Sequence, residues 1–220
     1  MEFDPFDSAN TEDPYPTYRW LLDQAPAYYN PDRDFWAISR LQDVKSALMD
    51  HQTYSSAAGV RIDDLLALAG PPLTMDPPRH GLLRNLVRKP FAVRAVAELA
   101  DMVEGNVDRI LADLLEDLPA AGELEVVSRF AKLVPVAVIC ELLGVPAEDA
   151  PMLKGWADAM LETVPGQTGS TPAAIDGARN LRSYWVQALG ARRAQPQDDI
   201  LSAIATAVVQ DGPLPEDEQV

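Results

Sequence analysis

Residues 76–91 constrain the fold most, because they combine a helix start with one cationic and one apolar face. Asp76 is a favourable N-cap, and Pro77 suits the first position of a helix. His80, Arg84 and Arg88 then recur at intervals of four and share one helical face. The opposite face is apolar and carries Leu82, Leu83, Leu86 and Val87. The pattern predicts a helix that buries this apolar face, at about 1.5–3 kcal/mol per side chain, and leaves the cationic face available to an anion.

This cationic face contrasts with the charge of the whole chain. The sequence has 18 Lys and Arg against 34 Asp and Glu, which gives a net charge of -16. Between residues 75 and 95, the only acid is Asp76, and the cations are Arg79, Arg84, Arg88, Lys89 and Arg94. A basic region on an acidic protein favours an anionic partner, although a solvated helix face is the plainer interpretation. The overall acidity argues against nucleic acid as that partner.

The segment resembles the C-helix signature of the bacterial (class I, soluble) cytochrome P450 enzymes, which are haem-thiolate monooxygenases. Their pattern is Asp-Pro-Pro-x-His-x-x-x-Arg, followed by a Lys and a Phe. The matching residues, in order, are Asp76, Pro77, Pro78, His80, Arg84, Lys89 and Phe91. Arg79 departs from the family at the x position, where Glu is common.

Weaker matches follow the family order along the whole chain. They are residues 13–16 for the A helix, 27–29 and 35–38 for an N-terminal hairpin, 43–48 for the B helix, 54–56 for the segment after it, 139–146 for the end of the E helix and 196–201 for the start of the H helix. The resemblance implies a mainly α fold with a small N-terminal β-sheet. Residues 1–220 would form the N-terminal part of a single cytochrome P450 domain, from helix A to helix H.

The catalytic half of that family is missing from the sequence. Neither the Phe-x-x-Gly-x-x-x-Cys-x-Gly loop, which carries the haem-ligating Cys, nor a Glu-x-x-Arg pair occurs. The only cysteine, Cys140, is expected to be a packed thiol inside a helix. Residues 213–220 have the composition of a helix start, so the chain is expected to stop just before the central helix of the family. We therefore expect no catalytic residue and no metal ligand in this chain.

The resemblance also implies roles for particular residues. His80 and Arg84 would contact the propionates of haem b, and Arg79, Arg88 and Lys89 would form the docking surface for a ferredoxin-type electron donor. The complete enzyme would insert one oxygen atom from O2 into a small organic substrate, and this half would be inactive alone. The candidate substrate-pocket residues are apolar side chains in the segments that the family places over its substrate, namely Val60, Ile62, Leu65, Leu66, Leu161 and Val164.

Two other hypotheses remain open. The missing thiolate loop also fits a truncated pseudo-enzyme that acts as a helical protein- or ligand-binding module. A third hypothesis is a haem-binding protein with His80 as an axial ligand. The single cysteine, and the lack of an apolar leader or of a membrane-length apolar run, predict a cytoplasmic protein without a membrane partner.

Periodicity predicts the remaining elements. They are a short helix within residues 1–26, a hairpin over 27–40, and helices near 41–50, 128–143, 148–162 and 173–193. A heptad-like apolar stripe over 93–117 fits a coiled coil, although a core helix packed in a bundle is the favoured prediction, and a short strand is expected at 124–127. Pro135 should kink its helix, and Gly144 with Pro146 should end it.

Overall fold

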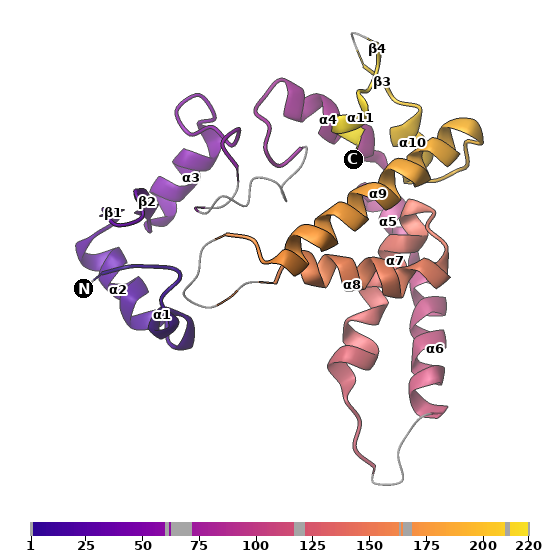
Figure 1. Cartoon of the computed structure of the whole chain (residues 1–220), viewed down its shortest axis with the longest axis horizontal. Helices are drawn as coiled ribbons and strands as arrows, with labels where there is room; N and C mark the ends of the chain where they lie inside the picture. Colours follow the sequence, from indigo (N-terminus) through magenta and orange to yellow (C-terminus); the bar gives the residue numbers. More distant parts are fainter. Residues whose placement is uncertain are drawn as a thin grey trace. The chain divides into compact units, whose positions relative to one another are not determined.

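The computed structural model describes residues 2–59, 62, 72–116, 122–162, 164, 169–209 and 212–219. Over these residues the chain is mainly helical, with two antiparallel two-stranded sheets (Figure 1). It divides into two compact units, of which the first comprises Met1–Gly81 and Ala159–Ala178. The second comprises Leu82–Asp158 and Arg179–Val220. The predicted fold class, mainly α with a small N-terminal sheet, is confirmed.

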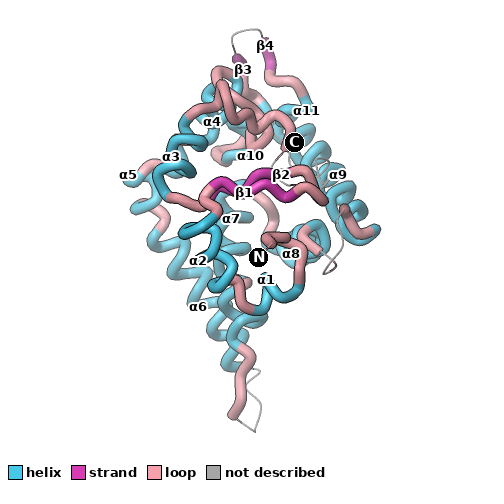
Figure 2. The backbone as a smooth tube through the Cα atoms, turned by 90° about the vertical axis from the view of Figure 1, so that its left-hand side faces the viewer, coloured by secondary structure: helices cyan, strands magenta, loops and turns pink. Residues whose placement is uncertain are grey.

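The first unit follows the predicted order of elements. It contains α1 (Ser8–Glu12), α2 (Tyr15–Gln24), β1 (Ala27–Asn30), β2 (Phe35–Ile38) and α3 (Leu41–Met49). The two strands form an antiparallel hairpin that pairs Ala27 with Ile38 and Asn30 with Phe35, visible in magenta in Figure 2. The hairpin and the helix that follows it therefore lie where the sequence predicts them.

Asn30 builds the turn of this hairpin. Its side chain is 1% exposed, and its Oδ1 accepts hydrogen bonds from the backbone N–H groups of Asp32 and Arg33, each at 3.0 Å. Its Nδ2 donates to the carbonyl oxygen of Phe3 at 2.9 Å. Arg33 also pairs with Asp4 at 2.8 Å. The turn chemistry of an Asn side chain thus shapes the hairpin and attaches the N-terminal residues to it.

The second unit is built from helices and one very short hairpin. Three helices cross the boundary between the units, α4 (Arg79–Val87), α8 (Ala150–Met160) and α9 (Pro172–Ala194). The other elements are η2 (Lys89–Phe91), α5 (Val93–Ala97), α6 (Ala100–Glu116), η3 (Val127–Ala131), α7 (Leu133–Leu143), η4 (Ala147–Asp149), α10 (Ile200–Ala205), β3 (Val208–Val209), β4 (Gly212–Pro213) and α11 (Glu216–Gln219). Helix α6 packs along η3 and α7, and α10 also contacts α7.

The continuous helix predicted over residues 93–117 is wrong, because the structure divides it into α5 and α6. Val93 is 90% exposed and Val96 is 50% exposed, whereas Ile110 and Leu114 are buried. The apolar stripe thus has a packing partner only along its C-terminal part. Since helices owe most of their stability to such packing, nothing in the described chain holds the two segments on one axis.

The strand predicted at residues 124–127 is also wrong. A strand needs a neighbour, and within the described ranges the strands pair only β1 with β2 and β3 with β4. The carboxylate of Glu125 instead accepts hydrogen bonds from the backbone N–H groups of Val127 at 3.0 Å and Ser128 at 2.7 Å. This capping arrangement begins the π-helical segment η3.

The C-terminal end of α7 agrees with the sequence prediction. Pro135 lies in the first turn of α7 and has no N–H for the carbonyl of Ala131, and the kink expected there stays a prediction. At the other end, Gly144 has a φ of 80°. The N–H of Gly144 donates to the carbonyl of Glu141 at 3.1 Å, and that of Val145 donates to the carbonyl of Cys140 at 2.8 Å. This is a Schellman C-cap.

The core of the second unit lies between α7, α8, α9 and α10. Its buried members are Cys140, Val145, Leu153, Leu189, Leu201 and Ala205. Beside it, the Tyr184 hydroxyl donates to the Asp149 carboxylate at 2.8 Å, and burial together with this bond raises the pKa of Tyr184 above its ordinary value. Cys140 is thus a packed thiol, as predicted, and burial raises its pKa, so it stays protonated at neutral pH.

A buried ion pair joins α9 to the ends of α7 and α10. Arg192 donates through Nε to Asp199 Oδ2 at 2.6 Å and through its Nη2 to the carbonyl of Gly144 at 2.5 Å. Asp199 is also the N-cap of α10, because its Oδ1 accepts from the N–H of Ser202 at 2.7 Å. We call Gly144, Arg192, Asp199 and Ser202 the α7–α10 joint.

Candidate functional site

Helix α4 carries two of the three residues of the predicted cationic face, His80 and Arg84, and it ends at Val87, one residue before Arg88. His80 and Arg84 both belong to α4 and lie one turn apart, so the helix itself fixes their relation. Leu83 is 6% exposed and is the buried residue of this helix, whereas Leu82, Leu86 and Val87 are half-buried. Arg84 is exposed and His80 is half-buried. The predicted burial of four apolar residues is therefore complete only at Leu83.

The predicted start of this helix needs correction. Helix α4 begins at Arg79, so Pro77 is not its first residue. The Asp76 carboxylate, the predicted N-cap, instead accepts hydrogen bonds from the hydroxyl of Ser55 and from the N–H of Ser56, the latter at 3.0 Å. These bonds hold the pKa of Asp76 below its ordinary value, with smaller contributions from His51 and His80. Asp76 thus attaches the segment after α3 to the beginning of α4.

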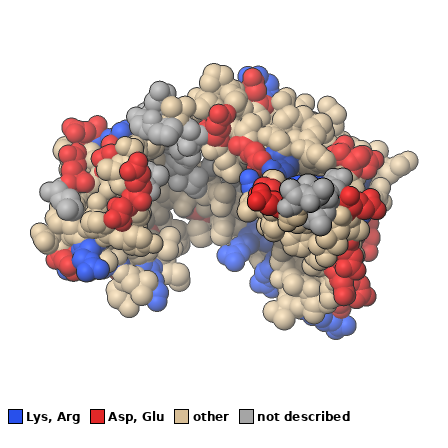
Figure 3. Space-filling model, turned by 90° about the horizontal axis from the view of Figure 1, so that it is seen from below, with Lys and Arg blue, Asp and Glu red and all other residues tan. Residues whose placement is uncertain are grey.

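The cations in the second half of α4 and just after it do not pair with acidic side chains in the described part of the chain. Arg84, Arg88 and Lys89 form no ion pair there, whereas Arg94 pairs with Glu98 at 3.1 Å. Arg88 and Lys89 are exposed at the C-terminal end of α4, and Arg79 is half-buried at its start. Figure 3 shows acidic side chains in several separate groups on the viewed surface, with cationic ones between them. The end of α4 therefore offers guanidinium and ammonium groups to an external anion.

The predicted substrate-pocket residues are not assembled into a described cavity. Val60, Leu65 and Leu66 lie outside the described residues. Ile62, Leu161 and Val164 are exposed, with Leu161 at 69%, and they belong to the first unit. The pocket assignment of all six residues stays a prediction.

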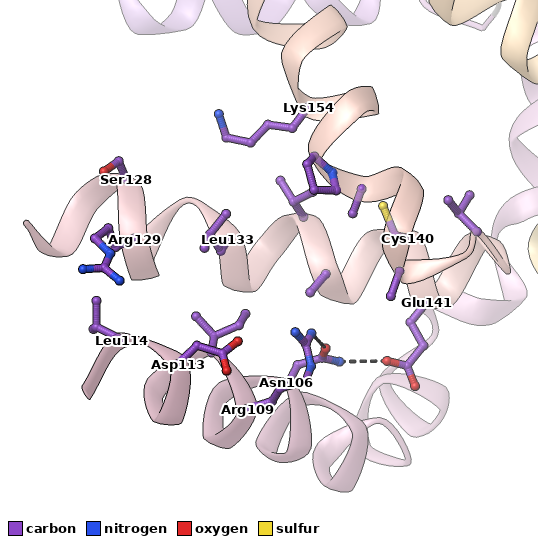
Figure 4. Close-up of a pocket in the computed structure, with 17 residues that line it drawn as sticks. Asn106, Arg109, Asp113, Leu114, Ser128, Arg129, Leu133, Cys140, Glu141 and Lys154 are labelled. Carbon is purple, nitrogen blue, oxygen red and sulfur yellow. Dashed lines mark hydrogen bonds between the residues drawn. The ribbon is translucent and has the colours of Figure 1, made fainter. Parts of the chain in front are cut away.

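The structure shows a cavity of about 500 Å³ that the sequence did not predict. It lies in the second unit, between α6, the η3–α7 segment and the beginning of α8 (Figure 4). Apolar side chains of α6 and α7, including Ile110, Leu133 and Val136, line it together with the buried Cys140. The sequence showed the apolar positions of α6, which recur three and four residues apart. It did not show how far α6 and α7 lie from each other.

A hydrogen-bonded network closes one end of this cavity. Asn106 donates through Nδ2 to Glu141 Oε2 at 2.8 Å, and Arg109 donates through Nη2 to Asn106 Oδ1 at 2.9 Å (Figure 4). Asn106 is 8% exposed, so its amide is satisfied almost entirely by protein groups. Among the described residues, no group of three His, Cys, Asp or Glu side chains is placed to hold a metal ion.

Within the described ranges, no helix combines the length and the apolar character that crossing a membrane requires.

Comparison with known proteins agrees with the sequence pattern. No family model matches the chain. The putative cytochrome P450 123 of Mycobacterium tuberculosis is 34% identical over 225 residues, which cover 100% of this chain and 55% of the relative. The cyclomarin C epoxidase of Salinispora arenicola is also 34% identical, and the match covers 92% of this chain and 53% of that protein. The chain spans about half the length of these curated relatives.

Solved structures give the same result for the fold. The cytochrome P450 of Mycobacterium marinum in complex with pseudoionone superimposes with a TM-score of 0.82 at 23% identity. The match covers 100% of this chain and 58% of that one. By its sequence relatives and by its fold, the chain corresponds to the N-terminal half of bacterial cytochrome P450 proteins.

Proposed function

We propose that this chain supplies the N-terminal half of a cytoplasmic haem-thiolate monooxygenase, which inserts one oxygen atom from O2 into a small organic substrate. The other half of the fold would supply the thiolate ligand, so this chain would be inactive alone. The observation that carries the proposal is the pairing of His80 with an exposed Arg84 on α4, within a chain whose relatives are cytochrome P450 enzymes.

The two α4 side chains suit the propionates of haem b. The Arg84 guanidinium has no ion-pair partner among the described residues, so it keeps its full set of donors for an external carboxylate. Charge-assisted hydrogen bonds of this kind contribute about 1.5–3 kcal/mol each. Haem supplies the oxygen chemistry once bound. The role of His80 and Arg84 is to hold and orient its two carboxylates, and Leu83 anchors the helix that carries them.

Replacing Arg84 by alanine in the complete enzyme should weaken haem retention by about tenfold to a hundredfold, because one charge-assisted bond to a propionate is lost. The measurement is the haem content that remains after dialysis against a haem-binding competitor. Arg94→Ala is the matched control, since Arg94 is exposed and, among the described residues, its ion pair is with the exposed Glu98. Equal haem retention in the wild type and in Arg84→Ala would contradict the assignment.

Arg79, Arg88 and Lys89 form the surface on which we propose that a ferredoxin-type donor docks. Arg88→Glu in the complete enzyme should slow reduction by the donor and leave haem bound, because the new carboxylate would repel an acidic partner. The effect should be largest at low ionic strength, where charges are least screened. Stopped-flow reduction measures it, with Arg182→Glu on α9 as a control of the same charge change. Reduction rates that match the wild type at low salt would argue against this surface.

We also propose that the substrate contacts lie in the segments that carry Val60, Ile62, Leu65, Leu66, Leu161 and Val164. Their apolar side chains favour an apolar organic substrate. The relative from Mycobacterium marinum, which binds pseudoionone, supports the same class.

A further inference from the structure

We propose that Asp76 and Ser55 are positioning residues for His80 and hold it where its imidazole can donate to a haem propionate. This inference rests on the proposed function, because it takes a propionate as the partner of His80. Asp76 does not bind the propionate itself, since both groups are anions. It acts through the backbone of α4, and all three residues belong to the first unit of the chain.

Asp76 is held at both its side chain and its backbone. Its carboxylate accepts hydrogen bonds from the hydroxyl of Ser55 and from the N–H of Ser56, the latter at 3.0 Å. Its carbonyl oxygen accepts from the N–H of His80 at 3.1 Å, in the spacing of an α-helix. One residue therefore connects the segment at 55–56 directly to the backbone that carries the His80 imidazole.

The link between Asp76 and α4 is stiff. Pro77 and Pro78 separate Asp76 from Arg79, the first residue of α4. A proline ring fixes its own φ and restricts the residue before it, so this link has few ways to absorb a displacement. A carboxylate that is held in place at Asp76 thus restrains the first turn of α4, where His80 lies.

The serine side of the contact is organised in the same way. The Oγ of Ser55 accepts from the N–H of Ala57 at 3.0 Å and donates its own hydrogen to Asp76. The carbonyl oxygen of Ser56 accepts from the N–H of Gly59 at 3.0 Å. Both donors to Asp76 therefore belong to a turn with its own hydrogen bonds, which fixes the direction from which they reach the carboxylate.

The contact depends on hydrogen-bond geometry, and this gives it a distinctive substitution pattern. The bonds from Ser55 and Ser56 keep the pKa of Asp76 low, so both of its oxygens are acceptors at neutral pH. An asparagine would still accept from the N–H of Ser56 and would donate through its amide to the Oγ of Ser55. Asp76→Asn should therefore preserve the position of His80 although it removes the charge, whereas Asp76→Ala should not.

The test measures the rate at which the complete enzyme loses haem to a competing haem-binding protein. Asp76→Ala and Ser55→Ala should each speed this loss by about threefold to tenfold, and Asp76→Asn should stay near the wild-type rate. Asp50→Ala is the matched control, because the Asp50 carboxylate accepts from the N–H of Thr53 at 3.2 Å within its own turn. It should lose haem at the wild-type rate.

A double-mutant cycle separates positioning from a general loss of stability. If Asp76 acts through His80, Asp76→Ala should cause no further haem loss in a His80→Ala background. Ser55→Ala, at an exposed position, completes the same cycle should Asp76→Ala fail to fold. Circular dichroism of each variant checks the fold.

The outcomes distinguish this inference from the proposed function. A His80→Ala enzyme that loses haem quickly, together with effects of Asp76→Ala or Ser55→Ala that are absent or fully additive to it, would overturn the positioning role alone. So would an Asp76→Asn enzyme that loses haem as fast as Asp76→Ala. If His80→Ala and Arg84→Ala both retained haem as the wild type does, the propionate assignment and this inference would fail together.

Discussion

Replacing Arg192 by alanine should lower the free energy of unfolding by about 3–5 kcal/mol, because it leaves a buried carboxylate without its cation. The side chain of Asp199 is only 7% exposed and that of Arg192 is 16% exposed. The same substitution removes the hydrogen bond that Arg192 donates to the carbonyl of Gly144. One side chain therefore holds the end of α7, the start of α10 and helix α9 together.

Urea unfolding followed by circular dichroism measures this effect. The neighbouring Arg193→Ala is the control, since its side chain is 38% exposed and its contacts with Glu216 and Gln219 lie on the surface. It should cost less than about 1 kcal/mol. If Arg192→Ala and Arg193→Ala lowered the free energy of unfolding equally, the contacts of Arg192 in the α7–α10 joint would not stabilise the fold as we expect.

Because of the ion pair between Arg192 and Asp199, we expect the free energy of unfolding to depend on pH. Burial alone would raise the pKa of Asp199, but the hydrogen bonds from Ser202 and Arg192, with the charge of Arg192, hold that pKa below 3.8. A lowered carboxylate pKa contributes stability that is complete above its unfolded value and is lost as the pH falls through its native value. The stability difference between wild type and Arg192→Ala should therefore shrink as the pH falls below 3.8.

Replacing Gly144 by alanine should destabilise the chain by about 2–5 kcal/mol, through backbone strain and overpacking at one position. The φ of Gly144 is 80°, which an L residue adopts only with strain. A Cβ atom there would also lie 2.1 Å from Asp199 Oδ2, and Arg192 and Ser202 hold that carboxylate in place. The clash therefore cannot be relieved by a small rotation without breaking the joint.

Gly122→Ala separates the two causes. Gly122 also has a positive φ, 73°, but a Cβ atom there meets nothing within 4 Å. It should therefore cost only the backbone strain, about 1–2 kcal/mol. If thermal unfolding showed the same loss of stability for Gly144→Ala as for Gly122→Ala, the contact of the new Cβ atom with Asp199 would contribute nothing to the destabilisation.

Local chemistry accounts for what the sequence predicted correctly. The Asn30 turn, the Schellman cap at Gly144 and the cationic face of α4 each depend on residues within a few positions of one another. The capping role expected of Asp76 was wrong because Ser55 and Ser56, about 20 positions earlier in the chain, hold its carboxylate. No local pattern around Asp76 predicts that partner.

The remaining differences come from packing between distant segments. The apolar stripe of residues 93–117 is continuous in the sequence, but only its C-terminal part finds a partner in α7. The strand expected at residues 124–127 lacks a neighbour in the described chain. The α6–α7 cavity depends on the distance between two helices, which periodicity does not contain. All three features lie in the second unit.

A carbon-monoxide difference spectrum, recorded for the chain alone and for the complete protein, shows whether the thiolate ligand comes from the other half of the fold. We expect the haem-thiolate carbonyl band only when the second half is present. We also expect Arg84→Ala to lower the intensity of the band through loss of haem. A complete protein without haem would contradict the account. So would a haem spectrum in the isolated chain that disappears in His80→Ala, since it would make His80 an axial ligand.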